Sequence, residues 1–495
     1  MSNSHHAVAV IGAGFAGLSL GRGFLQAGID DVVILERGDD VGGVWRENTY
    51  PGCACDVPSA LYSLSFAPNP DWSRGYAAQP EILDYARRVA SEHGVARLIR
   101  FGAEVTDARW DGNAQRWRIL TARGDLSADV LVTAMGPFGD PKLPDIPGRD
   151  SFAGTAFHSA RWNHDHDLRG ERVAVIGTGA SAIQVVPEVQ RQAAHLTVFQ
   201  RTPTWVLPRM DFTTSALQRR LFRHIPATQR ALRGAIYTMI EGLGLVGFVD
   251  VRFRHPYQLA GRRHLRRQVT DPQLRRKLTP DYMLGCSRAV LSDRYYPALS
   301  APNVALVTEA ISAITPGGVR TADGVEHELD TIIWSTGFDV PPKRQRVITG
   351  TSGETLADVW ATQIRGYLGT TLTGFPNLFT VLGPFSGAGN QSALFMVESQ
   401  VRYVVDAVRH MHEHGIGTVE VEPGVEERFM REMYERSKRS VWETGGCRSY
   451  YQDQHGRNTG LWPSWSWDYR ARTRRFDPQS YRLTPRRQAA AHAVA

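Results

Sequence analysis

Cysteine is scarce in this chain: Cys53, Cys55, Cys286 and Cys447 are the four among 495 residues. That count excludes a disulfide scaffold and fits a reducing compartment, so we expect a cytoplasmic protein. The chain also lacks a run of about 20 apolar residues, the length that a membrane-spanning helix needs. The first apolar run, from Ala7, has no basic segment before it and leads straight into glycines, so we expect no signal peptide.

Acidic residues are scarce in one stretch, Ala216 to Lys277, which holds 14 Lys and Arg against 3 Asp and Glu. This stretch has a net charge of +11, whereas the whole chain has a net charge of +7. The rest of the chain is therefore at −4, and no recognition motif for nucleic acid accompanies the basic residues. The stretch includes a 16-residue apolar run, 234–249, interrupted by Glu241. A solvated helical face is one interpretation. A helical lid over an apolar substrate entrance is the functional one we favour, and weak association with an anionic membrane surface is its alternative.

The start of the chain has the pattern of a dinucleotide-binding unit. Hydrophobic residues make up 42% of the sequence, as in ordinary globular proteins, and the short β-branched run Ala7–Ile11 suits a buried parallel strand. A glycine-rich turn, an apolar-periodic helix and a second strand ending at Glu36 follow it. Glycines let the backbone approach a pyrophosphate, and an acid at this spacing binds a ribose diol. The turn residues predicted to bind the cofactor are Gly12, Gly14, Phe15 and Gly17.

The pattern recurs after the strand Arg172–Ile176. Here the acid is replaced by Arg201, followed by Thr202, and a cation at this position suits the 2′-phosphate of NADPH. The first unit therefore predicts FAD and the second NADPH. The turn residues predicted to bind NADPH are Gly177, Thr178, Gly179, Ala180, Ser181 and Ala182.

The two units are predicted to be nested in one α/β fold. Two similar segments, Asp129–Gly136 and Asp330–Gly337, each combine an acid, a buried strand and a small-residue turn. Their separation suggests that the chain leaves the first unit near Pro141 and returns near Leu329. We predict two Rossmann-like domains with a helical insertion, and no metal site. The predicted ranges are 1–150 and 329–495 for FAD, 151–211 and 284–328 for NADP, and 212–283 for the insertion.

Two longer strings resemble the Baeyer–Villiger monooxygenases, a branch of the class B flavin-dependent monooxygenases. The pattern G-G-x-W-x4-Y-P-G-x3-D is met in full from Gly42 to Asp56. The family fingerprint F-x-G-x3-H-x3-W is met between the two units, followed by Asn163 where the family usually has Pro or Asp. Its residues here are Phe152, Gly154, His158 and Trp162.

A third match carries the chemistry. Arg288 precedes Tyr295 and Tyr296 as in the family's K-R-x6-Y-Y segment, whose arginine is catalytic, but Ser287 replaces the lysine that helps hold the 2′-phosphate. The resemblance implies that Arg288 stabilises a flavin peroxyanion attacking a ketone, and that Asp56 orients Arg288. It also implies FAD, NADPH, O2 and a small-molecule ketone, with an ester or lactone as product.

The remaining expectations concern the flavin surroundings and the rival functions. Gly43, Val44, Trp45, Tyr62 and Val105 complete the predicted FAD contacts, and His158 is expected to act at a hinge rather than in proton transfer. The segment Cys447–Tyr451 resembles the C-terminal part of one branch of the family. An S- or N-oxygenating flavin monooxygenase remains the alternative enzyme. A disulfide reductase is disfavoured because Cys53 and Cys55 have the wrong spacing. A non-catalytic FAD-binding protein is also disfavoured, because such a protein would not need the second dinucleotide-binding unit.

Overall fold

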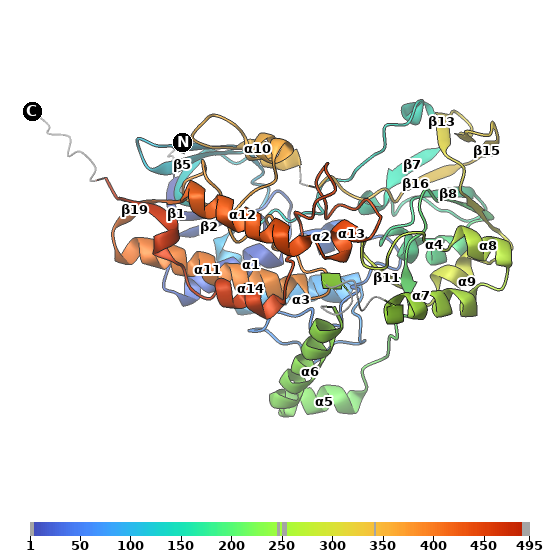
Figure 1. Cartoon of the computed structure of the whole chain (residues 1–495), viewed down its shortest axis with the longest axis horizontal. Helices are drawn as coiled ribbons and strands as arrows, with labels where there is room; N and C mark the ends of the chain where they lie inside the picture. Colours follow the sequence, from blue (N-terminus) through green and yellow to red (C-terminus); the bar gives the residue numbers. More distant parts are fainter. Residues whose placement is uncertain (1–3, 245–247, 250–254, 341–342, 488–495) are drawn as a thin grey trace, which may run out of the picture.

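The structure, a computed structural model, describes residues 4–244, 248–249, 255–340 and 343–487. Two sheets lie side by side along the long axis of the molecule, each with helices packed against it (Figure 1). The first carries the predicted FAD motif and the second the predicted NADPH motif.

The first sheet has eight strands, built around β1, whose neighbours β2 and β6 run parallel to it. Its strands in spatial order are β17 (Ile348–Thr349), β4 (Val105–Asp111), β5 (Arg116–Thr121), β6 (Leu126–Thr133), β1 (Ser4–Ile11), β2 (Val32–Leu35) and β3 (Ile99–Arg100), and β18 (Leu378–Thr380) pairs with β6.

The second sheet has five parallel strands and is nested in the sequence of the first. Its order is β12 (Val304–Val307), β9 (His195–Phe199), β8 (Arg172–Ile176), β16 (Thr331–Trp334) and β7 (Thr155–His158). The strand β16 pairs with β8, with Trp334 opposite Ile176, so the chain leaves this sheet after Trp334 and not near Leu329 as we predicted. The pattern of an acid, a strand and a small turn occurs in both sheets, so it could not tell which sheet β16 joins.

The central strands of both sheets, such as β2, β8 and β16, are buried on two faces, which explains their apolar sequences, whereas β4 and β5 alternate buried and exposed residues. Successive side chains of a strand point to opposite faces. Accordingly, Val8 and Val10 pack into the core shared with helices α1 (Phe15–Gln26) and α11 (Ala393–Glu413), whereas Ala9 and Ile11 pack into the core on the other side.

Further helices and small sheets cover these cores. The remaining helices are α2 (Val44–Glu47), α3 (Gln79–Glu92), α4 (Ala182–Gln190), α9 (Tyr295–Leu299), α10 (Leu356–Thr362), α12 (Pro423–Ser437), α13 (Val441–Thr444) and α14 (Ser466–Arg472). The small sheets are β10 (Val206–Leu207) with β11 (Val290–Leu291), β13 (Ile311–Thr315) with β14 (Gly318–Thr321) and β15 (Glu326–Glu328), and β19 (Ile416–Val421) with β20 (Tyr481–Pro485).

The predicted insertion holds the helices α5 (Ala216–His224), α6 (Pro226–Gly244), α7 (His255–Gln268) and α8 (Pro272–Lys277). The helices α5 and α6 lie at the lower edge of the molecule, while α7 and α8 lie beside the second sheet (Figure 1). Residues 245–247 of the predicted apolar run lie outside the described residues. Within the described part of the chain, none of the helices combines the length and the apolar character required to span a bilayer.

Candidate active site

The first glycine turn joins β1 to α1 as predicted, and its glycines are required by close backbone approaches. Gly12 has φ of +107°, and a Cβ there would lie 2.9 Å from the Ala134 carbonyl oxygen. A Cβ on Gly17 would lie 1.9 Å from the Gly12 oxygen. Gly14 faces Gly43, so the turn and the second glycine pair form one backbone cradle at the N-terminus of α1. This cradle fits a dinucleotide, because the first N–H groups of a helix have no partner within it.

Glu36 directly follows β2 at the edge of this cradle and is buried. Its Oε2 accepts a hydrogen bond from the Ala13 N–H at 2.8 Å, and its Oε1 accepts one from Arg46 at 2.9 Å. The carboxylate is therefore oriented by the glycine turn itself, at the place where an acid contacts a ribose. Arg46 was not predicted, because an arginine on a short helix carries no distinctive signal.

The second glycine turn joins β8 to α4 in the same way. Gly177 has φ of +116°, and a Cβ there would lie 2.3 Å from the Ser335 oxygen, whereas Gly179 has open space around it. Thr178 donates its hydroxyl to the Thr202 carbonyl at 2.8 Å, which ties the turn to the segment after β9. Arg201 begins that segment with an exposed side chain. Ala180 and Ser181 complete the turn, and Ala182 begins α4.

Arg288 and Asp56 meet as predicted, although 232 residues separate them. The guanidinium donates from Nε to Asp56 Oδ2 at 2.7 Å and from Nη2 to Oδ1 at 2.6 Å, a bidentate pair with both side chains only partly exposed. The charge of Asp56 holds the pKa of Arg288 well above its usual value, against the opposing effect of burial. Arg288 is thus a fixed, permanently charged donor whose direction is set by the carboxylate.

Trp45 and Tyr62 connect this pair to the glycine cradle. The Trp45 indole donates to the Tyr62 hydroxyl at 2.8 Å, and the ring of Phe15 meets that of Tyr62 edge-on at 6.0 Å. Burial raises the pKa of Tyr62, and the charges of Asp56 and Arg288 also act on it. Trp45, Tyr62 and Phe15 therefore form one aromatic cluster. Val44 begins α2 directly after Gly43, and Val105 begins β4.

The loop that carries Asp56 is fastened to the second unit by Gln184 of α4. Its amide donates to the Ala54 carbonyl at 3.0 Å and accepts from the Ala54 N–H at 3.3 Å. Tyr50 donates to the same amide oxygen at 3.1 Å. Gly52 is needed here, because a Cβ would lie 2.7 Å from the Gln184 carbonyl. Sequence reasoning missed Gln184, since a glutamine within a helix has no distinguishing pattern.

The linker fingerprint lies on β7 and its flanks. A Cβ on Gly154 would lie 2.3 Å from the Asp330 oxygen, so this glycine permits the close contact next to β16, while Phe152 packs in the adjoining core. Trp162 meets Phe157 edge-on at 5.1 Å. His158 is buried, accepts from the Ala160 N–H through Nδ1 at 3.0 Å, and has its pKa lowered by burial to about 4.

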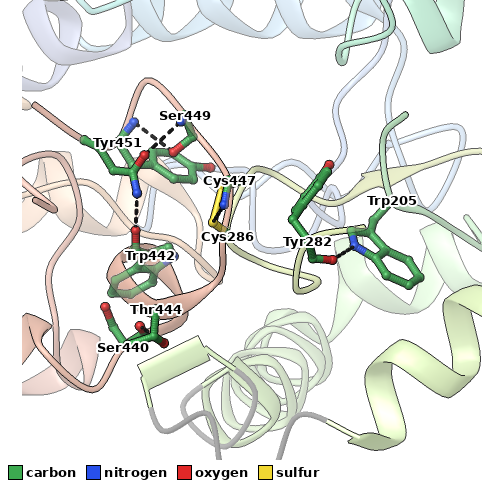
Figure 2. The surroundings of a disulfide bond; sticks show 10 residues. Trp205, Tyr282, Cys286, Ser440, Trp442, Thr444, Cys447, Ser449 and Tyr451 are labelled. Atoms are coloured by element: carbon green, nitrogen blue, oxygen red, sulfur yellow. Dashed lines mark hydrogen bonds between the residues drawn. A yellow bond between two sulfur atoms is a disulfide. The ribbon is translucent and has the colours of Figure 1, made fainter. Parts of the chain in front are cut away.

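A disulfide joins Cys286, two residues before Arg288, to Cys447 in the C-terminal segment (Figure 2). The Met283 N–H also donates to Gly445 O at 2.8 Å, so the two segments are joined by backbone as well. Burial raises the pKa of Tyr451 in the linked segment well above its usual value, and the charge of Arg288 opposes this rise. We did not predict the bond. The absence of a disulfide scaffold does not exclude a single disulfide, and pairing cannot be deduced from four cysteines.

Aromatic rings connect the fingerprint to this C-terminal segment. His158 lies 5.9 Å from Phe338, Phe338 lies 5.7 Å from Phe138, and Phe138 meets Tyr450 edge-on at 5.5 Å, all between ring centroids. Phe138 and Phe338 follow the two similar strand segments that we had noted, but nothing in either segment indicated that the phenylalanines would meet.

Known proteins resemble this chain over nearly its whole length. The model of the flavin-binding monooxygenase-like family matches residues 5–227. A Baeyer–Villiger monooxygenase of Streptomyces coelicolor is 47% identical over 97% of this chain and 93% of its own length, and one of Pseudomonas aeruginosa is 43% identical over 97% and 92%. The crystal structure of OTEMO in complex with FAD and NADP superposes with a TM-score of 0.87 at 28% identity, over 98% of this chain and all of that one.

Proposed function

The chain belongs to the Baeyer–Villiger monooxygenases, and from this premise we propose which of its residues perform the reaction. It is an FAD- and NADPH-dependent monooxygenase that inserts one atom of O2 beside a ketone carbonyl to give an ester or lactone. FAD held at the first glycine turn would supply the acceptor for the hydride of NADPH and the group that activates O2. The observation that carries our assignment is the bidentate pair of Arg288 and Asp56 beside the glycine cradle.

In this proposal Arg288 stabilises negative charge that develops on oxygen at the reacting centre. Its guanidinium keeps its proton throughout, because Asp56 favours the charged form. A charge already fixed in place requires no reorganisation during the reaction, which is the source of its catalytic effect. Asp56 acts through Arg288 by fixing the direction of the fork.

The two glycine turns would hold the cofactors, FAD against Gly12–Gly17 and Glu36, and NADPH against Gly177–Ala182. We propose that Arg201 pairs with the 2′-phosphate, with Thr202 beside it. We propose the cytoplasm as the compartment because the chain has only four cysteines. The Cys286–Cys447 bond is an exception to this argument, since disulfides are rare in cytosolic proteins.

Product analysis tests the reaction class. The purified enzyme is incubated with NADPH and O2 and a panel of linear, cyclic, aryl and polycyclic ketones, with an alkyl aryl sulfide as a separate substrate. We expect ketones to gain one oxygen as an ester or lactone by mass spectrometry. Oxidation of the sulfide with no ketone converted would favour the S- or N-oxygenating alternative.

Arg288→Ala tests the residue assignment. The variant should bind FAD and oxidise NADPH, while ester formation falls about 10²–10³-fold, as when one fixed electrostatic contact to a developing oxyanion is removed. Arg288→Lys should restore little of it, because lysine lacks the planar fork that pairs with Asp56. Ester yields like those of the wild type in the alanine variant would show that Arg288 is not catalytic.

A further inference from the structure

Helix α6 is turned with its polar side chains toward the protein. The side chains of Gln229, Arg233, Tyr237 and Glu241 recur every four residues and so share one face. Gln229 donates to Asn69 O at 2.6 Å, Arg233 donates to Ser63 O at 2.8 Å, and Glu241 accepts from the Ser466 hydroxyl at 3.0 Å. These bonds fasten α6 to the FAD unit, and they explain the acid inside the apolar run.

The opposite face of α6 is apolar and exposed. Met239 and Leu243 expose 55% and 50% of their surface. The outward residues, with Thr238 among them, are mostly small or apolar: Ala227, Ala231, Gly234, Ala235, Met239 and Leu243. A surface helix normally has the reverse arrangement, with its apolar face toward the core.

Helix α5 continues this exposure. Leu217, Leu221 and Ile225 are spaced by four residues and expose 78%, 41% and 50% of their surface, and α5 has no buried residue. Of the fourteen large hydrophobic side chains that are exposed in the described part of the chain, eight lie between Met210 and Leu259. We call the outward side chains of α5 and α6, with Ile225, the α5–α6 apolar face. Concentrated apolar exposure of this kind marks an interaction site.

The charges around the face decide what it binds. From Ala216 to Ile240 the chain has no acid and five arginines, of which Arg233 faces the protein and Arg223 pairs with Asp71. Arg220 and Arg230 are exposed. Two copies of this face would bring like charges together, which disfavours a homodimer. An anionic lipid surface satisfies both properties, because apolar side chains enter the acyl boundary while arginines meet the headgroups. We propose that the α5–α6 apolar face docks on anionic membranes.

Vesicle co-sedimentation of the FAD-bound enzyme tests this proposal. We expect binding to vesicles of phosphatidylcholine and phosphatidylglycerol, no binding to phosphatidylcholine alone, and release in 1 M salt, where the screening length falls to about 3 Å. Absence of binding to the anionic vesicles at low salt would overturn the proposal. Equal binding to both vesicle types would also overturn it.

Two variants separate the apolar and charged contributions. Leu217→Ser with Leu221→Ser should weaken vesicle binding roughly tenfold for each side chain withdrawn from lipid. Arg220→Gln with Arg230→Gln should weaken it about 30-fold, from about 1 kcal/mol for each arginine near the surface.

Matched controls come from elsewhere on the surface. Leu120→Ser with Leu143→Ser removes two leucines that expose 40% and 45% of their surface, and Arg474→Gln with Arg475→Gln removes the same charge. Both should bind vesicles like the wild type, and all variants should keep the flavin absorbance and melting temperature. Loss of binding in a control pair would overturn the assignment to this face. Self-association in solution that the Leu217→Ser and Leu221→Ser pair abolishes would identify a second copy as the occupant instead.

Discussion

At the scale of single residues, the replacement of a glutamate by an arginine distinguishes the two nucleotide units. Glu36 is buried and bonded to its own glycine turn, whereas Arg201 stands exposed after β9, where a phosphate can reach it. Arg201→Ala should raise the KM for NADPH by the equivalent of about 1.5–3 kcal/mol and leave that for NADH nearly unchanged. Steady-state kinetics with both coenzymes measure this.

Ser287→Lys is the complementary change, because it restores the lysine that the family usually has next to the catalytic arginine. It should lower the KM for NADPH selectively. Arg475→Ala is the matched control for the loss of an exposed arginine. An equal effect of Arg201→Ala on both coenzymes would show that this side chain does not contact the 2′-phosphate.

His158 contributes to stability through its neutral form. Burial lowers its pKa to about 4, whereas an unfolded histidine titrates near 6.5. Between these values the unfolded chain binds a proton that the folded chain does not, so stability is lost as the pH falls from about 6.5 to 4. On going from pH 7.5 to 5, His158 should cost about 2 kcal/mol of unfolding free energy, at 1.36 kcal/mol per pKa unit. Urea unfolding at the two pH values measures the loss.

His158→Gln is the comparison, since its amide oxygen can still accept from the Ala160 N–H. The variant should be less sensitive to pH than the wild type over this interval. The same pH sensitivity in both proteins would show that His158 titrates normally. His158 is therefore neutral at pH 7, and its hinge role stays a prediction.

At the scale of elements, the Cys286–Cys447 bond joins the segment before Arg288 to the one that carries Tyr450 and Tyr451. The bond closes a loop of 161 residues. For a loop of this length the chain-entropy model gives a stabilisation of about 5 kcal/mol, and removal of a native disulfide typically costs about 2–5 kcal/mol. The double variant Cys286→Ser and Cys447→Ser should lose stability in that range. It should also form less ester for each NADPH oxidised, because the segment beside Arg288 is no longer tied down.

A reductant provides the internal control for the disulfide. Dithiothreitol should shift the urea unfolding curve of the wild type toward that of the double variant and leave the variant unchanged. Cys53 and Cys55 are free and buried, so the reductant finds no bond to reduce there. A wild type that is indifferent to the reductant in both stability and ester yield would contradict the prediction.

At the scale of the whole molecule, the sequence predicts the features that local patterns encode. Strand, glycine turn and helix follow one another within about 30 residues, so both nucleotide units and their fold class were accessible. The meeting of Arg288 with Asp56 came from the family resemblance. The sheet to which β16 belongs, the contact of Gln184 with Ala54 and the Cys286–Cys447 bond depend on pairing between distant segments, which leaves no local signal.

The FAD and NADPH units meet where the loop that carries Asp56 packs against α4. Gln184 of α4 fixes the position of this loop. Gln184→Ala removes three hydrogen bonds, two to Ala54 and one from Tyr50, and leaves polar groups at the boundary unpaired. FAD content and NADPH affinity should be kept, because neither glycine turn is touched. The position of Asp56, and with it the direction of Arg288, should loosen. We therefore expect a larger share of NADPH oxidation to end in hydrogen peroxide rather than ester, measured as the ratio of the two products.

Gln184→Glu, which keeps the acceptors and loses the donor to Ala54 O, should lie between the wild type and the alanine variant. An unchanged product ratio in both variants would show that the boundary between the units is held by other contacts.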